Sequence, residues 1–77
     1  MEKLLEILRE INPDITYEGR NDLFTSGDLD SMNIILLTSE ISDEFDVEIK
    51  APDIIPENFD SAEAIMEMIY RLQEEQQ

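Results

Sequence analysis

The chain has 77 residues but contains no cysteine and no histidine. Disulfides and the usual zinc sites are therefore excluded as sources of stability. A domain of this size buries only about 60% of the surface that its unfolded chain exposes, so its core is small. Small domains without such cross-links favour regular helices packed through local contacts. We therefore expect one all-α domain over residues 1–77, ordered over about residues 2–72.

Three segments repeat apolar residues at the spacing of an amphipathic helix. The first lies near the start of the chain and is stopped by Asn12 and Pro13, because a residue before proline avoids the helical region. The second is expected from Ser31 to Phe45, and the third follows Asp60. The apolar positions that define the stripes are Leu4, Leu5, Leu8 and Ile11, then Ile34, Leu37, Ile41 and Phe45, then Ile65, Met68, Ile69 and Leu72.

A long irregular segment separates the first two helices. Residues 12–30 show no sustained period, and irregular segments longer than about 12–15 residues are often functional. Asp30 or Ser31 can cap the second helix, since either side-chain oxygen can accept a free backbone N–H. The expected architecture is a small bundle of three main helices with this long first loop.

The last part of the chain is predicted to contain one short element and one long helix. Residues 53–57 can form a brief helical turn whose length Pro56 limits. Asp60 with Glu63 fits a capping box at the start of the last helix, although aspartate replaces serine or threonine. The tail at 73–77 has nothing to bury and is expected to fray.

Acidic residues dominate the charges: 20 Asp and Glu stand against five Lys and Arg, for a formal net charge of −15. Such a balance argues against binding to nucleic acid or to anionic membranes. Solubility alone can explain it, but it also steers a chain toward partners with basic docking surfaces. No stretch approaches the ~20 apolar residues of a membrane span. The N-terminal segment lacks the pattern of a secretory signal, so we expect a cytoplasmic monomer.

The chain lacks the residues that most enzymatic mechanisms require. Without histidine or cysteine, neither a Ser-His-Asp arrangement nor a thiol nucleophile can exist. Gly19 and Gly27 are the only glycines, too few for a phosphate-binding loop. Asp28 and Asp30 resemble calcium ligands, but the residues after them do not fit the EF-hand spacing. We therefore expect no catalytic residue, no metal site and no independent enzymatic activity.

Ser31 is the residue with the most informative position. It is predicted at the first turn of a helix, after an exposed loop, where another enzyme can reach its hydroxyl. Free N–H groups and the helix dipole favour a phosphate there. With no base nearby to activate it, Ser31 can accept a group from a second enzyme but cannot act as a nucleophile alone. A helix cap is the simpler interpretation, and the local pattern leaves both open.

Residues 23–32, with the sequence Leu-Phe-Thr-Ser-Gly-Asp-Leu-Asp-Ser-Met, resemble the modification site of the acyl carrier protein family. Members share an Asp-Ser-Leu or Asp-Ser-Met triplet that opens the second helix. The connector with Val47 and Ile49, and the last helix after residues 58–61, also fit. The resemblance covers roughly residues 2–72 and implies a four-helix bundle with a short third helix.

The resemblance also implies a function. A phosphopantetheinyl transferase, using magnesium and coenzyme A, would attach 4'-phosphopantetheine to Ser31. The thiol of this arm would carry an acyl or aminoacyl group as a thioester, for exchange with activating ligases and downstream synthase or transferase enzymes. The residues expected to be recognised by the transferase and other partners are Asp30, Met32, Leu36, Ser39, Glu40 and Asp43.

Three positions differ from the usual carriers of bacterial fatty-acid synthesis. Gly27 lies one residue further from the serine, Asn33 stands where those carriers tend to have aspartate, and Leu36 where they tend to have an acid. The Leu-Asp-Ser-Met form is more similar to D-alanyl carriers of teichoic acid synthesis and to free-standing carriers of specialised metabolism. An alternative from another class is a non-covalent acidic helical module that docks a partner through Met32 and Leu36.

Overall fold

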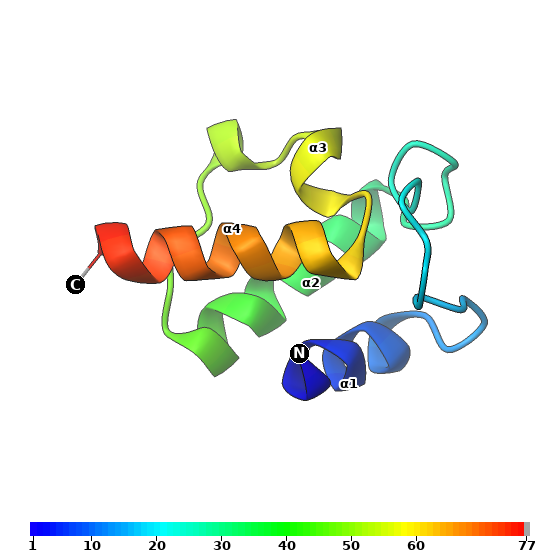
Figure 1. Cartoon of the computed structure of the whole chain (residues 1–77), viewed down its shortest axis with the longest axis horizontal. Coiled ribbons are helices and arrows are strands. Elements are labelled where there is room, and N and C mark those ends of the chain that lie inside the picture. Colours follow the sequence, from blue (N-terminus) through cyan, green and yellow to red (C-terminus); the bar gives the residue numbers. More distant parts are fainter. Residues whose placement is uncertain (77) are drawn as a thin grey trace.

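The computed structural model describes residues 1–76, which form four α-helices and no strand. The elements, in order, are α1 (Glu2–Ile11), α2 (Ser31–Phe45), the 3₁₀ turn η1 (Ala51–Asp53), α3 (Pro56–Phe59) and α4 (Ala62–Glu75). Figure 1 shows α2 passing behind α4, with α1 below this pair, α3 above it, and the 12–30 loop gathered at one end. The predicted all-α bundle with a long first loop is confirmed.

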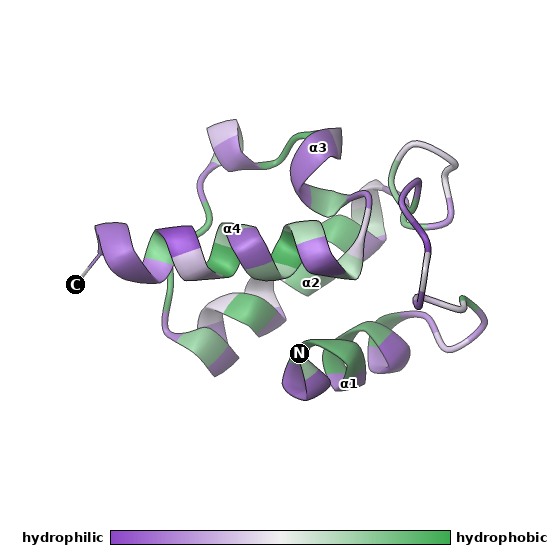
Figure 2. Ribbon diagram, in the orientation of Figure 1, coloured by the Kyte–Doolittle hydropathy of each residue, from purple (hydrophilic) through white to green (hydrophobic). Residues whose placement is uncertain are grey.

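The core lies where the apolar sides of the helices meet. Figure 2 shows apolar and polar residues alternating in stripes along α1 and α4, as amphipathic helices require. The predicted stripe of α4 is buried throughout, while Phe45 at the end of the α2 stripe is only partly buried. The buried set is Leu4, Ile7, Leu8, Tyr17, Leu23, Leu29, Ile34, Leu37, Ile41, Val47, Phe59, Ala62, Ile65, Met66, Met68, Ile69 and Leu72.

Tyr17 connects the first half of the 12–30 loop to the end of α1 through hydrogen bonds. Its side chain is only 1% exposed, and its hydroxyl donates to the carbonyl oxygens of Leu8 and Asn12, each 2.9 Å away. These carbonyls belong to the last turn of α1 and its cap, and the Leu8 oxygen also accepts from the Asn12 N–H at 2.9 Å. Burial, with a smaller effect of the Asp28 charge, raises the pKa of Tyr17 to about 12. The phenol is therefore a neutral donor at physiological pH.

The region predicted as one turn at 53–57 contains two separate elements. η1 ends at Asp53, and α3 starts only at Pro56, with Ile54 and an extended Ile55 between them. Pro56 does not limit a helix as expected but begins one, because the first helical position needs no N–H donor. The short third helix implied by the resemblance is therefore α3, shifted toward the C-terminus.

The expected cap of the last helix was wrong by one residue. The Ser61 hydroxyl, not the Asp60 carboxylate, accepts the hydrogen bond from the Ala64 N–H, at 2.9 Å. Both residues are good caps, and the sequence pattern selected the aspartate. The Asp60 carboxylate is engaged instead with the 12–30 loop.

The expected unpartnered tail also differs from the structure over the part that is described. α4 continues to Glu75, and the Gln76 side chain makes two hydrogen bonds of 2.9 Å with the backbone of Glu48, one as acceptor and one as donor. A glutamine amide can satisfy a backbone N–H and C=O together, which gives this end of the chain a partner. Residue 77 lies outside the described range.

Candidate functional site

Asp30 caps α2 and leaves the Ser31 hydroxyl free of that role. The Asp30 carboxylate accepts a hydrogen bond from the Asn33 N–H at 2.9 Å, and its carbonyl accepts from Ile34, also at 2.9 Å. Ser31 is the first residue of the helix and is exposed. The two capping alternatives are therefore resolved in favour of Asp30.

Buried leucines hold the chain just before Ser31. Leu23 and Leu29 are both fully buried, and the Leu29 N–H donates to the Leu23 carbonyl at 2.9 Å. Gly27 has a φ of 88°, which an L side chain rarely adopts, so the turn between the leucines favours glycine here. Burial of Leu29 therefore fixes the backbone immediately before Asp30 and Ser31.

Arg20 organises the outer side of this turn. Its Nε lies 2.8 Å from the Asp22 carboxylate, and one Nη lies 2.7 Å from that of Asp28. All three side chains are partly exposed, and ion pairs of this kind contribute little to stability because solvent screens them. Arg20 therefore connects Asp22 with Asp28 within the loop but adds little to the stability of the fold.

Asp60 holds the same turn from the inner side. One of its oxygens accepts from the backbone N–H groups of Phe24 and Thr25, at 3.1 and 2.8 Å. The Thr25 hydroxyl donates to the same carboxylate at 2.8 Å, and the Asp60 carbonyl accepts from the Leu23 N–H at 2.9 Å. These donors favour the charged form, chiefly the Thr25 N–H, and they lower the pKa of Asp60 below its usual value.

This contact predicts an acid-dependent loss of stability. The pKa of Asp60 is lower in the folded chain than its ordinary value of 3.8. The stabilisation by its carboxylate is therefore complete above about pH 3.8 and is lost as the pH falls through the pKa of the folded state. Asp60→Asn keeps an uncharged acceptor, which makes weaker hydrogen bonds. In urea unfolding, the difference in free energy between the wild type and this variant should shrink steadily below pH 3.8. A difference that stays constant down to pH 2 would contradict the assignment.

The predicted recognition residues of α2 lie together on its outer face. Met32, Leu36, Ser39, Glu40 and Asp43 are all exposed and follow each other at spacings of one helical turn or one residue. Met32 is 72% exposed and Leu36 50% exposed, and because they are one turn apart they form an exposed apolar patch. Asp30 is exposed at the start of the same helix.

Ile35 also belongs to this face, although it is not among the predicted recognition residues. It is 66% exposed and lies three residues after Met32 and four before Ser39. The signal was present in the sequence, because Ile34, Leu37 and Ile41 define the buried side and Ile35 falls outside that stripe. We call Met32, Ile35, Leu36, Ser39, Glu40 and Asp43 the α2 outer face.

All five basic residues of the chain are engaged in ion pairs with acids. Within residues 1–76, neither Glu40 nor Asp43 forms an ion pair with a basic residue. The α2 outer face therefore combines apolar side chains with acids that have no such internal counterion. The pairs are Lys3–Glu44, Arg9–Glu18, Arg20–Asp22, Arg20–Asp28, Lys50–Glu48, Arg71–Asp53 and Arg71–Glu75.

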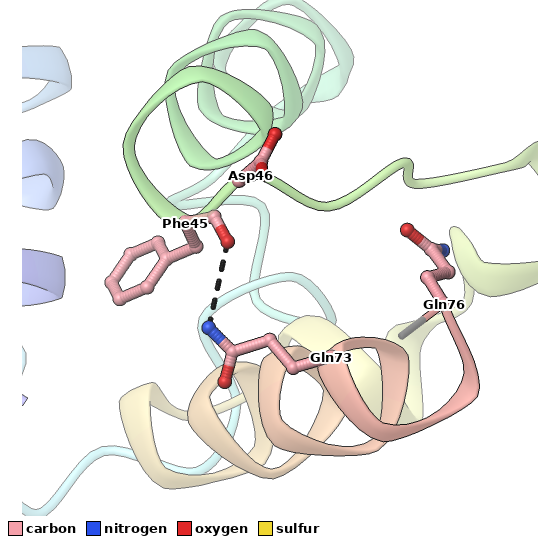
Figure 3. A pocket seen from close by; sticks show the side chains of 4 residues that line it. All are labelled: Phe45, Asp46, Gln73 and Gln76. Carbon is pink, nitrogen blue, oxygen red and sulfur yellow. Dashed lines mark hydrogen bonds between the residues drawn. The ribbon is translucent and has the colours of Figure 1, made fainter.

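An open hollow of about 440 Å³ lies at the far end of α2. Figure 3 shows its lining by Phe45, Asp46, Gln73 and Gln76, with the Gln73 amide donating to the Phe45 carbonyl at 3.5 Å. Asp46 ends α2 with a φ of 55°, in the left-handed conformation usual for glycine at this position. At 1.5 Å per residue, the helix separates Ser31 from Phe45 by about 21 Å. This hollow is thus remote from the candidate site.

Residues 1–76 contain no group of three or more Asp, Glu, His or Cys side chains placed to hold a metal ion. None of their helices has the length and hydrophobicity of a membrane span.

Comparison with known families matches residues 2–69 to the phosphopantetheine attachment site. Neither the curated proteins nor the solved structures gave a match. Domains of this family carry a covalently attached 4'-phosphopantetheine, generally act as non-catalytic carriers, and interact with modifying and synthase enzymes. The match spans most of the chain, and the helical fold agrees with it. The chain therefore belongs to the phosphopantetheine attachment site family, as its resemblance to acyl carrier proteins predicted.

Proposed function

We propose that the chain is an acyl or aminoacyl carrier whose phosphopantetheine arm is attached to the Ser31 hydroxyl. The observation that carries this proposal is the combination of an exposed serine at the first position of α2 with a separate residue, Asp30, acting as the cap. A modified serine that also capped the helix would lose its cap on modification. Here the cap is independent of the serine, so modification leaves α2 intact.

The residues at this position suit a phosphodiester. The N–H groups of Ser31 and Met32 precede the first hydrogen bond of the helix, which Ile34 donates to Asp30, so the helix itself does not use them. Such groups and the positive end of the helix dipole stabilise a phosphate. The arm supplies a thiol that holds the cargo as a thioester, while this chain anchors and presents it.

The modification is a phosphoryl transfer carried out by another enzyme. The Ser31 oxygen would form a bond to the phosphorus that bears the pantetheine, and the pyrophosphate bond of coenzyme A would break. The nucleotide part leaves with its own phosphate, and a base on the transferase takes the serine proton. This chain has no histidine to act as that base, and we expect the transferase to supply it.

The α2 outer face is the proposed recognition surface, together with Asp30. Its apolar residues offer contact area, while Glu40 and Asp43 favour a partner with basic side chains around an apolar patch. Leu36 and Asn33, in place of acids, support a D-alanyl or specialised-pathway carrier over a carrier of bacterial fatty-acid synthesis. Loading assays distinguish these cargos: a D-alanine-activating ligase with ATP should load the modified chain if the first applies.

The test is incubation of the purified chain with coenzyme A, magnesium and several broad-specificity transferases. Intact-protein mass spectrometry should show the addition of one phosphopantetheinyl group. Peptide mapping should place that group on Ser31. No mass change with any of the transferases would overturn the proposal and favour the alternative, a non-covalent module that binds through the exposed Met32, Ile35 and Leu36.

A further inference from the structure

A continuous series of contacts runs from Asp60 to Ser31. Asp60 accepts hydrogen bonds from the main chain of residues 23–25, at 2.8 to 3.1 Å. The Leu23 carbonyl then accepts from the Leu29 N–H at 2.9 Å, and the fully buried Leu29 lies two residues before Ser31. Each step is a hydrogen bond or a buried side chain, so the place of Leu29 depends on Asp60.

We propose that Asp60 is a positioning residue for the modification of Ser31, a role that rests on the proposed function. Asp60 acts through residues 23–29 and fixes where the first turn of α2 stands relative to the surface that a transferase must contact. The Ser31 oxygen has to meet the coenzyme A phosphate in line with the bond that breaks. A displacement of about 1 Å caused far from the reacting atoms can cost roughly 100-fold in rate.

Asp60 is better suited to this role than Arg20, which holds the same turn from outside. The Arg20 contacts are ion pairs between partly exposed side chains, which are weak. Asp60 instead binds two backbone N–H groups and one hydroxyl with a single carboxylate. The contacts of both residues are charge-assisted hydrogen bonds, but those of Asp60 go to the main chain and therefore restrain the backbone itself. The Asp60 contact therefore controls the path of the chain toward Ser31.

Transferase kinetics on Asp60→Ala provide the test, with Glu67→Ala as the matched control. Glu67 is an exposed carboxylate in the middle of α4, so its removal changes the net charge equally. For Asp60→Ala we expect kcat to fall by roughly 10- to 100-fold while KM for coenzyme A stays unchanged. Amide exchange should accelerate at Phe24 and Thr25 but not at Ile41 or Ile69. Glu67→Ala should retain the wild-type kcat.

A second pair of variants keeps the proposal testable if Asp60→Ala folds poorly. Thr25→Val removes the hydroxyl donor to Asp60 and should lower kcat, and Thr25→Ser should restore it. The positioning role is overturned if a variant shows faster amide exchange at residues 24–25 but keeps the wild-type kcat. It is overturned equally if exchange accelerates throughout and the loss of rate vanishes on cooling, since Asp60 would then act only on global stability. A wild-type chain that no transferase modifies refutes the proposed function itself, which is a different result.

Discussion

Replacing Ser31 with alanine is expected to abolish phosphopantetheine attachment completely while leaving the fold unchanged. The Ser31 hydroxyl is the proposed acceptor, and alanine offers no oxygen to bond to phosphorus. The helix should not suffer, because Asp30 provides the cap and alanine has a higher helix propensity than serine. We expect the free energy of unfolding to change by no more than about 0.5 kcal/mol. Mass spectrometry after incubation with coenzyme A and a transferase measures the first effect, and urea unfolding the second.

Ser39→Ala is the matched control for this experiment. Ser39 is exposed on the same helix and also carries a hydroxyl, but it lies two turns into α2, away from the free N–H groups. The Ser39→Ala variant should be modified at the wild-type stoichiometry. Modification that persists in Ser31→Ala, or that disappears in Ser39→Ala, would show that another hydroxyl is the acceptor.

The largest effect on stability is expected from Leu37→Ala. Leu37 is fully buried between the helices, and truncating such a leucine typically costs about 2–5 kcal/mol. A chain of 77 residues has a total stability of only about 4–12 kcal/mol, so this single change removes a large part of it. The midpoint of urea unfolding should fall by at least about 1 M.

Its neighbour Leu36 provides the control with the same chemistry. Leu36 is half exposed on the α2 outer face, so Leu36→Ala leaves no cavity and should change stability by about 0.5 kcal/mol at most. Leu36→Ala should instead weaken binding to partner enzymes, measured by titration with a transferase that modifies the wild type. Equal destabilisation by the two substitutions would mean that the helix is rotated from the orientation described here.

The end of α1 and the start of α2 were predictable because their signals are local. Asn12 before Pro13 ends the first helix, and a cap at Asp30 or Ser31 before the apolar stripe begins the second, although the local pattern did not choose between these two caps. The position of Ser31 at the first turn follows from the same signals. The outer face of α2 was predictable in part, because any apolar residue outside the Ile34 stripe has to face away from the core, and only Ile35 was left out.

The role of Asp60 was not predictable, because its partners are distant in sequence. Asp60 and Ser61 are adjacent and both can cap a helix, so a local pattern cannot choose between them. What decides is the loop containing Thr25, 35 residues earlier, whose N–H needs an acceptor. The pairing of Gln76 with Glu48 escaped prediction for the same reason, since only the packed bundle brings them together.

The internal pairing of every basic side chain affects how copies of this chain meet each other. All five basic side chains pair with acids of their own chain, and the net charge of −15 leaves the surface of each copy strongly acidic. Two copies therefore repel as they approach, at separations up to about the 10 Å over which 0.1 M salt screens charge. We therefore expect a copy bound to a partner enzyme to repel a second copy over this distance, which disfavours two copies at one docking surface.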